Sequence, residues 1–171
     1  MKITVPCHYY LQWDNKLYPG GSCNLTCAAM VLKQLGMKGP KMGYDRLPDN
    51  LLAYADANNL DRHKLEDIDK IIETFGLKDR SSYTTSFDAL KKHVKAGGLA
   101  IVHGNFTPSG HIVVVRGLDE EAGKWFVNDP AGKWNNGYRD YSSGEGVWYD
   151  GAWFRKMIAP DGVIWAHLIS K

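Results

Sequence analysis

The chain has 171 residues, of which 44% are hydrophobic and 23% are charged, and its formal net charge is +2. That length is enough for one compact domain with its own hydrophobic core, so we expect a single domain over residues 1–171. The small net charge gives no electrostatic basis for nucleic-acid binding, and we expect no nucleic-acid partner. The longest apolar run, residues 27–32, is far too short to cross a bilayer, which argues against membrane insertion.

The N-terminal segment has no extended apolar stretch after Lys2 and does not resemble a secretory signal peptide. We therefore expect a protein made in the cytoplasm, whose export needs help from other proteins. The three cysteines, Cys7, Cys23 and Cys27, are an odd number, and a four-residue spacing on one helix face is a poor geometry for a disulfide. A thiol-dependent protein in a reducing compartment fits this pattern better than a disulfide framework.

The first half of the chain shows the spacing of amphipathic helices. Apolar residues recur every three to four positions in four segments, and glycines follow three of these segments. Ser22, Asp49 and Ser86 are suitable N-caps. We expect helices at residues 23–35, 49–58, 65–75 and 86–96.

The second half of the chain shows the pattern of β-strands. The strongest strand begins at His111, and residues 119–123 form the turn of a hairpin. We expect strands at residues 99–103, 111–118, 124–128, 146–148 and 163–169. Helices followed by an antiparallel sheet predict an α+β fold class.

Cys23 follows Gly20-Gly21-Ser22 and falls in the first turn of the first expected helix. The partial positive charge of a helix N-terminus favours the thiolate, which is the nucleophilic form of cysteine. His111 begins a strand much later in the chain, and Asp129 follows the next strand. Cysteine, histidine and aspartate in this order are the components of an activated-thiol hydrolase.

Each of these residues also has an ordinary structural interpretation. Free cysteines are most often small buried hydrophobes, which would make Cys23 a packing residue. His111 could be a hydrogen-bonded histidine at a strand start. Asp129 before Pro130 is a common turn pair, and Gln12 could be one of many surface glutamines.

A zinc site is the rival chemistry for the cysteines. Cys7 and His8 with Cys23 and Cys27 have spacings in the range of zinc ligands, but no second compact ligand pair follows. We therefore expect no metal and no cofactor. The other histidines have no partner nearby in the sequence and are expected at the surface or in packing: His63, His93, His103 and His167.

Four motifs in chain order resemble those of the papain-like cysteine peptidases, and most closely the C39-like branch related to the bacteriocin-leader processing peptidases. The matching segments span residues 5 to 132 and are Tyr9-Tyr10-Leu11-Gln12, Ser22-Cys23-Asn24-Leu25-Thr26, Gly110-His111-Ile112-Val113 and Val127-Asn128-Asp129-Pro130. The resemblance implies a papain-like fold in which N-terminal helices pack on a C-terminal antiparallel β-sheet.

The roles implied by this resemblance agree with the chemistry of the side chains. Cys23 would attack a carbonyl carbon and form a thioester, and His111 would pair with the thiolate and protonate the leaving amine. Asp129 would accept a hydrogen bond from the imidazole and fix its tautomer. Gln12 would donate its side-chain N–H to the oxyanion, together with the backbone N–H of Cys23.

The chain departs from the pattern of many relatives near the nucleophile. Asn24 and Leu25 stand where many relatives have glycine and proline, and Cys27 stands at a position usually held by a small residue. Neither change removes a catalytic group. Cys27 is expected to line the wall behind the nucleophile.

Residues 134–153 are rich in aromatic residues and glycines, including Tyr141, Tyr149 and Trp153. Trp134, Tyr138 and Trp148 are our candidates for substrate binding, because aromatics with a polar group suit a cleft rim that holds a peptide or glycan. The alternative is a set of glycine-rich hairpins whose aromatics cover the sheet.

These inferences predict a cysteine hydrolase that cleaves amide bonds, with a peptide or peptidoglycan as its substrate. We expect a peptidoglycan peptidase or amidase of the phage endolysin or antibacterial lysin type, acting as a monomer. A holin or a secretion system would release it to the cell wall. The alternatives are a protein- or leader-processing peptidase, an acyltransferase with the same thioester chemistry, and a catalytically inactive binding module on the same fold.

Overall fold

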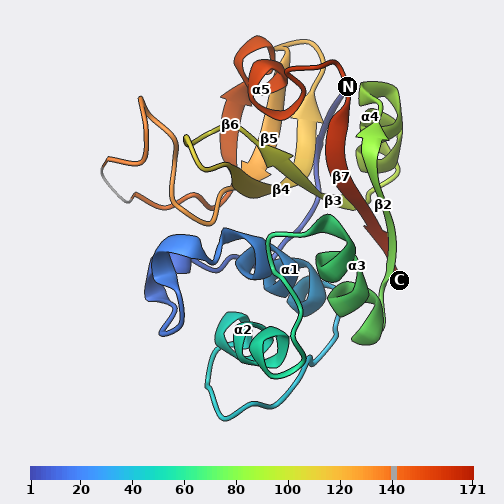
Figure 1. Cartoon of the computed structure of the whole chain (residues 1–171). Coiled ribbons are helices and arrows are strands. Elements are labelled where there is room, and N and C mark those ends of the chain that lie inside the picture. The colour runs from blue at the N-terminus through green and yellow to red at the C-terminus, as the bar shows by residue number, and fades with distance from the viewer. Residues whose placement is uncertain (140–141) are drawn as a thin grey trace.

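In the computed structural model, which describes residues 1–139 and 142–171, helices pack on both faces of one seven-stranded sheet (Figure 1). The helices are α1 (Cys23–Gln34), α2 (Leu47–Ala57), α3 (Leu65–Thr74), α4 (Phe87–Lys95) and α5 (Gly151–Ile158), with the short 3-10 helices η1 (Gln12–Asp14) and η2 (Pro19–Gly21). The strands are β1 (Lys2–Thr4), β2 (Lys78–Thr85), β3 (Leu99–Gly104), β4 (His111–Asp119), β5 (Lys124–Asn128), β6 (Val147–Asp150) and β7 (Ile164–Ser170).

All strand pairs of the sheet are antiparallel. The strand order is β2-β7-β3-β4-β5-β6, and β1 pairs with the end of β4. The expected α+β class is therefore confirmed.

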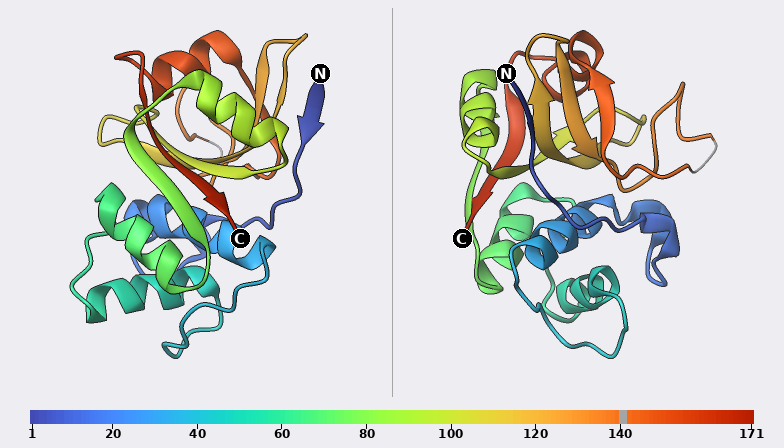
Figure 2. Two further views of the ribbon diagram at one scale, coloured as in Figure 1. Left: turned by 90° about the vertical axis from the view of Figure 1, so that its right-hand side faces the viewer. Right: turned by 180° about the vertical axis from the view of Figure 1, so that it is seen from behind.

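The sheet separates two hydrophobic cores. Ile101 and Val114 point towards α1, α2 and α3, whereas Val102, Val113 and Val115 point towards α4 and α5. This division follows from the alternation of side chains along a strand, which sends successive residues to opposite faces. Both views in Figure 2 show α1–α3 as a layer below the sheet, with α4 and α5 in the upper half of the molecule. The central strands are thus buried on both sides.

The local signals for helix ends are borne out in part. Ser86 caps α4, since its side chain accepts a hydrogen bond from the Ala89 backbone N–H. Gly76 follows α3 with a φ of +107°, a left-handed conformation that favours glycine. Asp49 does not cap α2, which begins two residues earlier. Its buried carboxylate instead accepts hydrogen bonds from the backbone of Lys16 and Leu17.

Besides the two 3-10 helices, the described elements that lie outside the expected set are β1, β2 and α5. Strand β2 has the sequence Lys-Asp-Arg-Ser-Ser-Tyr-Thr-Thr, which lacks the apolar alternation of a typical strand, yet it pairs with β7 along most of its length. Among the described residues, no helix combines the length and the apolar character that a membrane span requires.

The order of the strands brings the expected site residues on α1, β4 and β5 together. Strand β4 lies between β3 and β5, and helix α1 packs across β4. The start of α1 carries Cys23, the start of β4 carries His111, and Asp129 directly follows β5. Residues that are far apart in the chain therefore meet at one edge of the two layers.

Candidate active site

A cleft of about 900 Å³ opens between the helical layer and the sheet. Its helical side includes Gln12 and Cys23, and its sheet side includes His103, His111 and Tyr138. Binding sites for small molecules and peptide segments are commonly concave, with a few polar groups among apolar walls. The cleft therefore has the size and lining of a substrate site.

Cys23 is the first residue of α1 and is partly buried in this cleft. Ser22 precedes it, but the Ser22 side chain makes no capping hydrogen bond. Its hydroxyl instead accepts a hydrogen bond from Asn15 Nδ2 at 2.9 Å, and the same nitrogen donates to Thr26 Oγ1 at 2.9 Å. Asn15, which is buried, thus ties the loop after η1 to the first turn of α1 and fixes the position of the nucleophile.

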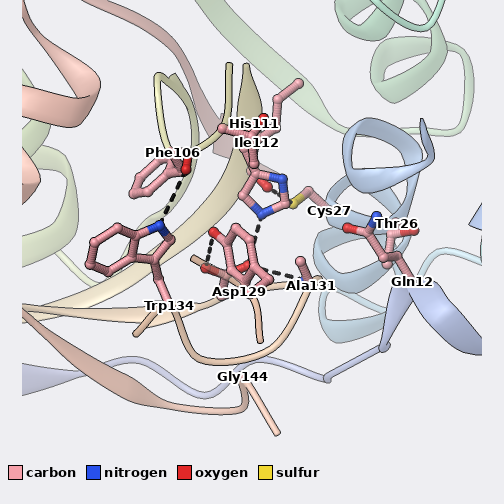
Figure 3. Close-up of polar contacts among 12 residues, drawn as sticks. Gln12, Thr26, Cys27, Phe106, His111, Ile112, Asp129, Ala131, Trp134 and Gly144 are labelled. Carbon is pink, nitrogen blue, oxygen red and sulfur yellow. Dashed lines mark hydrogen bonds and ion pairs between the residues drawn. The ribbon is translucent and has the colours of Figure 1, made fainter. Parts of the chain in front are cut away.

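The other two cysteines are enclosed by protein. Burial raises the pKa of Cys7 to about 12 and raises the pKa of Cys27 well above its usual value. Cys27 lies one turn after Cys23, and its Sγ donates to the Ile112 carbonyl at 3.3 Å (Figure 3). Both groups are therefore held as thiols, whereas Cys23 reaches the cleft.

His111 and Asp129 form a buried pair. His111 Nε2 lies 2.8 Å from Asp129 Oδ1, and Figure 3 shows the imidazole directly above the carboxylate. Burial alone would lower the pKa of His111, but the negative charges of Asp129 and Cys23, with hydrogen bonds to both, raise it to about 10. Since Nε2 contacts Asp129, the other ring nitrogen is left to face Cys23. The raised pKa means that the imidazole of His111 is held in its protonated form.

Gln12 lies in η1 and is buried at the helical side of the cleft. Its backbone N–H donates to the Pro130 carbonyl at 2.8 Å, so the loop after Asp129 anchors it. Its side-chain Nε2 donates one hydrogen to the Pro19 carbonyl at 2.9 Å. An amide nitrogen carries two hydrogens, so a second donor remains for a ligand in the cleft. The role of Gln12 in the oxyanion hole stays a prediction.

The model of the peptidase C39-like family matches residues 3–152. The chain belongs to this family. The family supports cysteine peptidase activity, in line with the arrangement of Cys23, His111 and Asp129. No curated protein matches the sequence.

Among solved structures, the chain is similar to a Bacillus anthracis protein that is assigned to the C39-like peptidases. The similarity has a TM-score of 0.65 at 18% identity and covers 100% of this chain and 98% of the other. At that identity the likeness concerns the fold. The C39-like fold is therefore shared along the whole chain.

A group of tyrosines around Asp129 was not expected as part of the site. Tyr138 and Tyr149 both donate to Asp129 Oδ2 at 2.7 Å, and Tyr9 donates to the Asp129 backbone carbonyl at 2.7 Å. The Tyr138 ring also lies against His111, with centroids 5.0 Å apart. Phenols that combine an apolar ring with a donor are suited to this buried position. In this C39-like chain the tyrosines hold the carboxylate that orients the imidazole.

Gly144 supports the same residue from the backbone side. It accepts a hydrogen bond from the Asp129 N–H at 2.9 Å, and its own N–H donates to the Tyr9 hydroxyl at 3.1 Å. A Cβ at this position would clash with the Asp129 backbone. The sequence offers a weak signal for this contact, since one glycine in a glycine-rich loop does not stand out.

The three expected substrate-binding aromatics lie in different places. Tyr138 lines the cleft. Trp134 does not line it: its indole N–H donates to the Phe106 carbonyl at 3.2 Å, and its ring packs at a tilt against Trp153, with centroids 4.5 Å apart. Trp148 lies on β6 against Phe126 and does not line the cleft. Tyr141 lies outside the described residues.

The rival zinc site finds no support in the geometry. Within residues 1–139 and 142–171, no group of three or more histidine, cysteine, aspartate and glutamate side chains is placed to hold a metal ion. Cys27 faces the Ile112 carbonyl, as described above. The cysteines thus take separate roles, one in the cleft and two in packing.

Proposed function

We propose that this C39-like protein hydrolyses amide bonds through a thioester on Cys23, and that its substrate is bacterial cell-wall peptide. The observation that carries the mechanism is the placement of His111. One ring nitrogen is bound to Asp129 at 2.8 Å, and Cys23 interacts with the ring from the cleft. This is the arrangement that a thiolate–imidazolium nucleophile requires.

The first half of the reaction forms the thioester. The Cys23 thiolate attacks the carbonyl carbon of the amide, and the electron pair of the C=O bond moves to the oxygen. Gln12 Nε2 and the backbone N–H of Cys23 would stabilise that oxyanion. The C–N bond then breaks, and His111 gives its proton to the leaving amine.

The second half regenerates the enzyme. The neutral imidazole of His111 takes a proton from water, and the resulting hydroxide attacks the thioester carbonyl. The C–S bond breaks, and the thiolate leaves with the imidazolium again beside it. Asp129 keeps the imidazole in one orientation during both steps, because the tyrosine hydroxyls and the Ala131 N–H hold its carboxylate.

Two properties favour a cell-wall substrate. The cleft is large and of mixed polarity, which suits a segment of a polar polymer. The sequence isoelectric point of about 8.3 favours contact with an anionic wall. A leader- or protein-processing peptidase would use the same chemistry and is the second candidate, because the same cleft also fits an extended peptide.

The test is digestion of purified sacculi followed by mass spectrometry of the soluble products. We expect new free amines, loss of activity after thiol alkylation, and unchanged activity in EDTA. The Cys23→Ala variant, shown to be folded by circular dichroism, is the matched control. Intact sacculi together with cleavage of an unstructured leader peptide would replace the wall substrate by the second candidate. Loss of activity in EDTA that zinc restores would overturn the mechanism.

A further inference from the structure

A second cluster of polar side chains crosses the sheet on the same face as the cleft. His167 Nδ1 lies 2.7 Å from Asp79 Oδ2, and His167 Nε2 lies 3.1 Å from His103 Nε2. The side chains of Asp79 and His167 are fully buried, whereas His103 is partly buried and lines the cleft. The three residues come from β2, β7 and β3, so the cluster leads from the sheet edge into the cleft. His103 and His167 have no partner nearby in the sequence, and only the pairing of the strands brings them together.

With a neutral His167 ring, the contacts of the cluster define the proton positions on both histidines. His167 Nδ1–H donates to the Asp79 carboxylate, and His167 Nε2 presents a lone pair to His103. The contact between the two Nε2 atoms then requires His103 to donate from Nε2. Burial and the neighbouring His167 lower the pKa of His103 to about 3, so this ring is neutral at ordinary pH. His103 Nδ1 is consequently an unprotonated acceptor.

His103 lies in the same cleft as Cys23, the proposed nucleophile. Gly104 pairs with His111 across β3 and β4, so His103 is the next residue along the wall of the same cleft. Among the described residues, the structure gives His103 Nδ1 no hydrogen-bond partner. Trp165 lies beside it, with ring centroids 6.1 Å apart, and is 50% exposed at the end of the cleft. The acceptor thus lies next to an aromatic side chain that Tyr83 supports by an edge-to-face contact and that is half exposed.

We propose that His103 and Trp165 form a binding subsite for the substrate peptide, in which His103 Nδ1 accepts a hydrogen bond from a backbone amide N–H and Trp165 packs against the adjoining residue. This inference rests on the proposed function, because it assigns the wall of the same cleft. A buried carboxylate with one hydrogen-bond partner is weak evidence for stability, since burying a polar group costs free energy that a single hydrogen bond does not fully return. Asp79 also leaves its Oδ1 without a partner among the described residues. The Asp79–His167 contact is better explained by its effect on His103, whose ring it orients.

The first test reads the tautomer directly. In the folded protein with ¹⁵N-labelled histidine, His103 Nδ1 should show the nitrogen shift of an unprotonated ring atom. In the Cys23→Ala variant, that shift should move when a soluble wall stem peptide is added. A proton on Nδ1, or a resonance that neither this peptide nor an unstructured leader peptide moves, would overturn the proposal.

The second test compares labelling of Cys23 by iodoacetamide and by an iodoacetylated wall stem peptide. His103→Phe keeps an aromatic ring between His167 and Trp165 but has no acceptor to present to the cleft. It should raise the peptide concentration for half-maximal labelling about 3- to 10-fold, the effect of one lost hydrogen bond, and leave the iodoacetamide rate unchanged. His8→Phe is the matched control, because His8 is exposed and does not line the cleft. It should change neither rate.

The outcomes separate the two proposals. Equal labelling of wild-type and His103→Phe protein by the peptide overturns the subsite, and so does an equal loss with both reagents. No reaction of wild-type Cys23 with iodoacetamide overturns the proposed mechanism instead. If wild-type labelling saturates only with an iodoacetylated leader peptide, the proposed wall substrate is wrong. The wild-type protein and the His103 variant are then compared with that leader peptide. Thermal unfolding of each variant confirms that a folded protein is compared.

Discussion

Two histidine–carboxylate pairs lie in the same sheet and have nearly the same geometry. His111 contacts Asp129 at 2.8 Å, and His167 contacts Asp79 at 2.7 Å, and both pairs are buried. They differ in what the second ring nitrogen faces. For His111 it is the thiol of Cys23, and for His167 it is another imidazole, that of His103. The comparison shows that a buried His–Asp pair orients a ring, and that the neighbour on the far nitrogen decides its chemistry.

The carboxylates of the two pairs also differ. Asp129 accepts hydrogen bonds from Tyr138, Tyr149 and the Ala131 backbone in addition to His111. Asp79 has His167 on one oxygen, and no partner among the described residues on the other. A buried carboxylate with several donors keeps hydrogen-bond partners when the histidine is removed, whereas one with a single partner is left with none. The two pairs should therefore respond to mutation in opposite ways.

Removal of each histidine should give the largest contrast. His111→Ala should lower kcat at least about 1,000-fold, because the leaving amine loses its proton donor. Its fold should survive, since Asp129 keeps three other donors. His167→Ala should instead lower the free energy of unfolding by roughly 3–5 kcal/mol, because it leaves the Asp79 charge buried and unpaired. Steady-state kinetics and urea unfolding measure the two effects. Near-normal activity of the His111 variant would show that His111 and Asp129 are not the catalytic pair.

Gln12→Ala should lower kcat about 100-fold with little change in KM, because its amide would meet the oxyanion only in the transition state. Gln12 would then act on kcat, whereas His103, which we place in substrate binding, would act on the affinity for the peptide. Full kinetics on a soluble wall peptide separate kcat from KM. A rise in KM alone would move Gln12 from the oxyanion hole to substrate binding, beside His103.

Asp129→Asn should lower the rate roughly 10- to 100-fold, less than His111→Ala, because the imidazole itself remains. The protein should stay folded, since an amide oxygen can still accept from the hydroxyls of Tyr138 or Tyr149. Circular dichroism establishes the fold before kinetics are compared. An Asp129→Asn variant with the full wild-type rate would show that the imidazole needs no orienting group.

The two clusters should also give stability opposite dependences on pH. The pKa of folded His111 is raised to about 10, so its contribution is complete below the unfolded pKa of about 6.5 and is lost as pH rises towards 10. The pKa of His103 is lowered to about 3, so its contribution is present above about 6.5 and is lost as pH falls towards 3. Unfolding curves of His111→Ala and His103→Gln should lose the alkaline and the acid slope respectively. Parallel pH profiles for both variants would contradict this assignment.

The elements with clear periodicity could be predicted from the sequence. Helices α1, α3 and α4 and strands β3, β4 and β5 lie close to where apolar spacing and glycine signals placed them. Strand β2 could not be predicted, because its buried positions include Asp79 and Thr85, whose place in the core depends on partners from β7. Helix α5 follows a glycine-rich aromatic segment whose pattern resembles hairpins, and its Asp150 cap is visible only beside the finished helix.

The candidate site divides in the same way. Cys23, His111 and Asp129 stand beside recognisable local motifs, so the sequence places them together in one mechanism. His103 and His167 have no such motif, since their partners lie on strands 64 and 88 residues away in the chain. The aromatic segment shows a third case. Tyr138 and Tyr149 turn inward to Asp129, and only the completed sheet shows that Trp165 is an exposed aromatic at the cleft.

The long separation in the chain between the two sides of the cleft has a consequence for protein synthesis. Contacts that join α1 to β4, such as Cys27 with Ile112, bridge 85 residues. Such contacts form late, because closing a long loop costs entropy before any contact repays it. A nascent chain therefore brings Cys23 to His111 only after β4 and β5 have been synthesised and the sheet has closed. On the proposed mechanism, the reactivity of Cys23 would then appear together with the native fold.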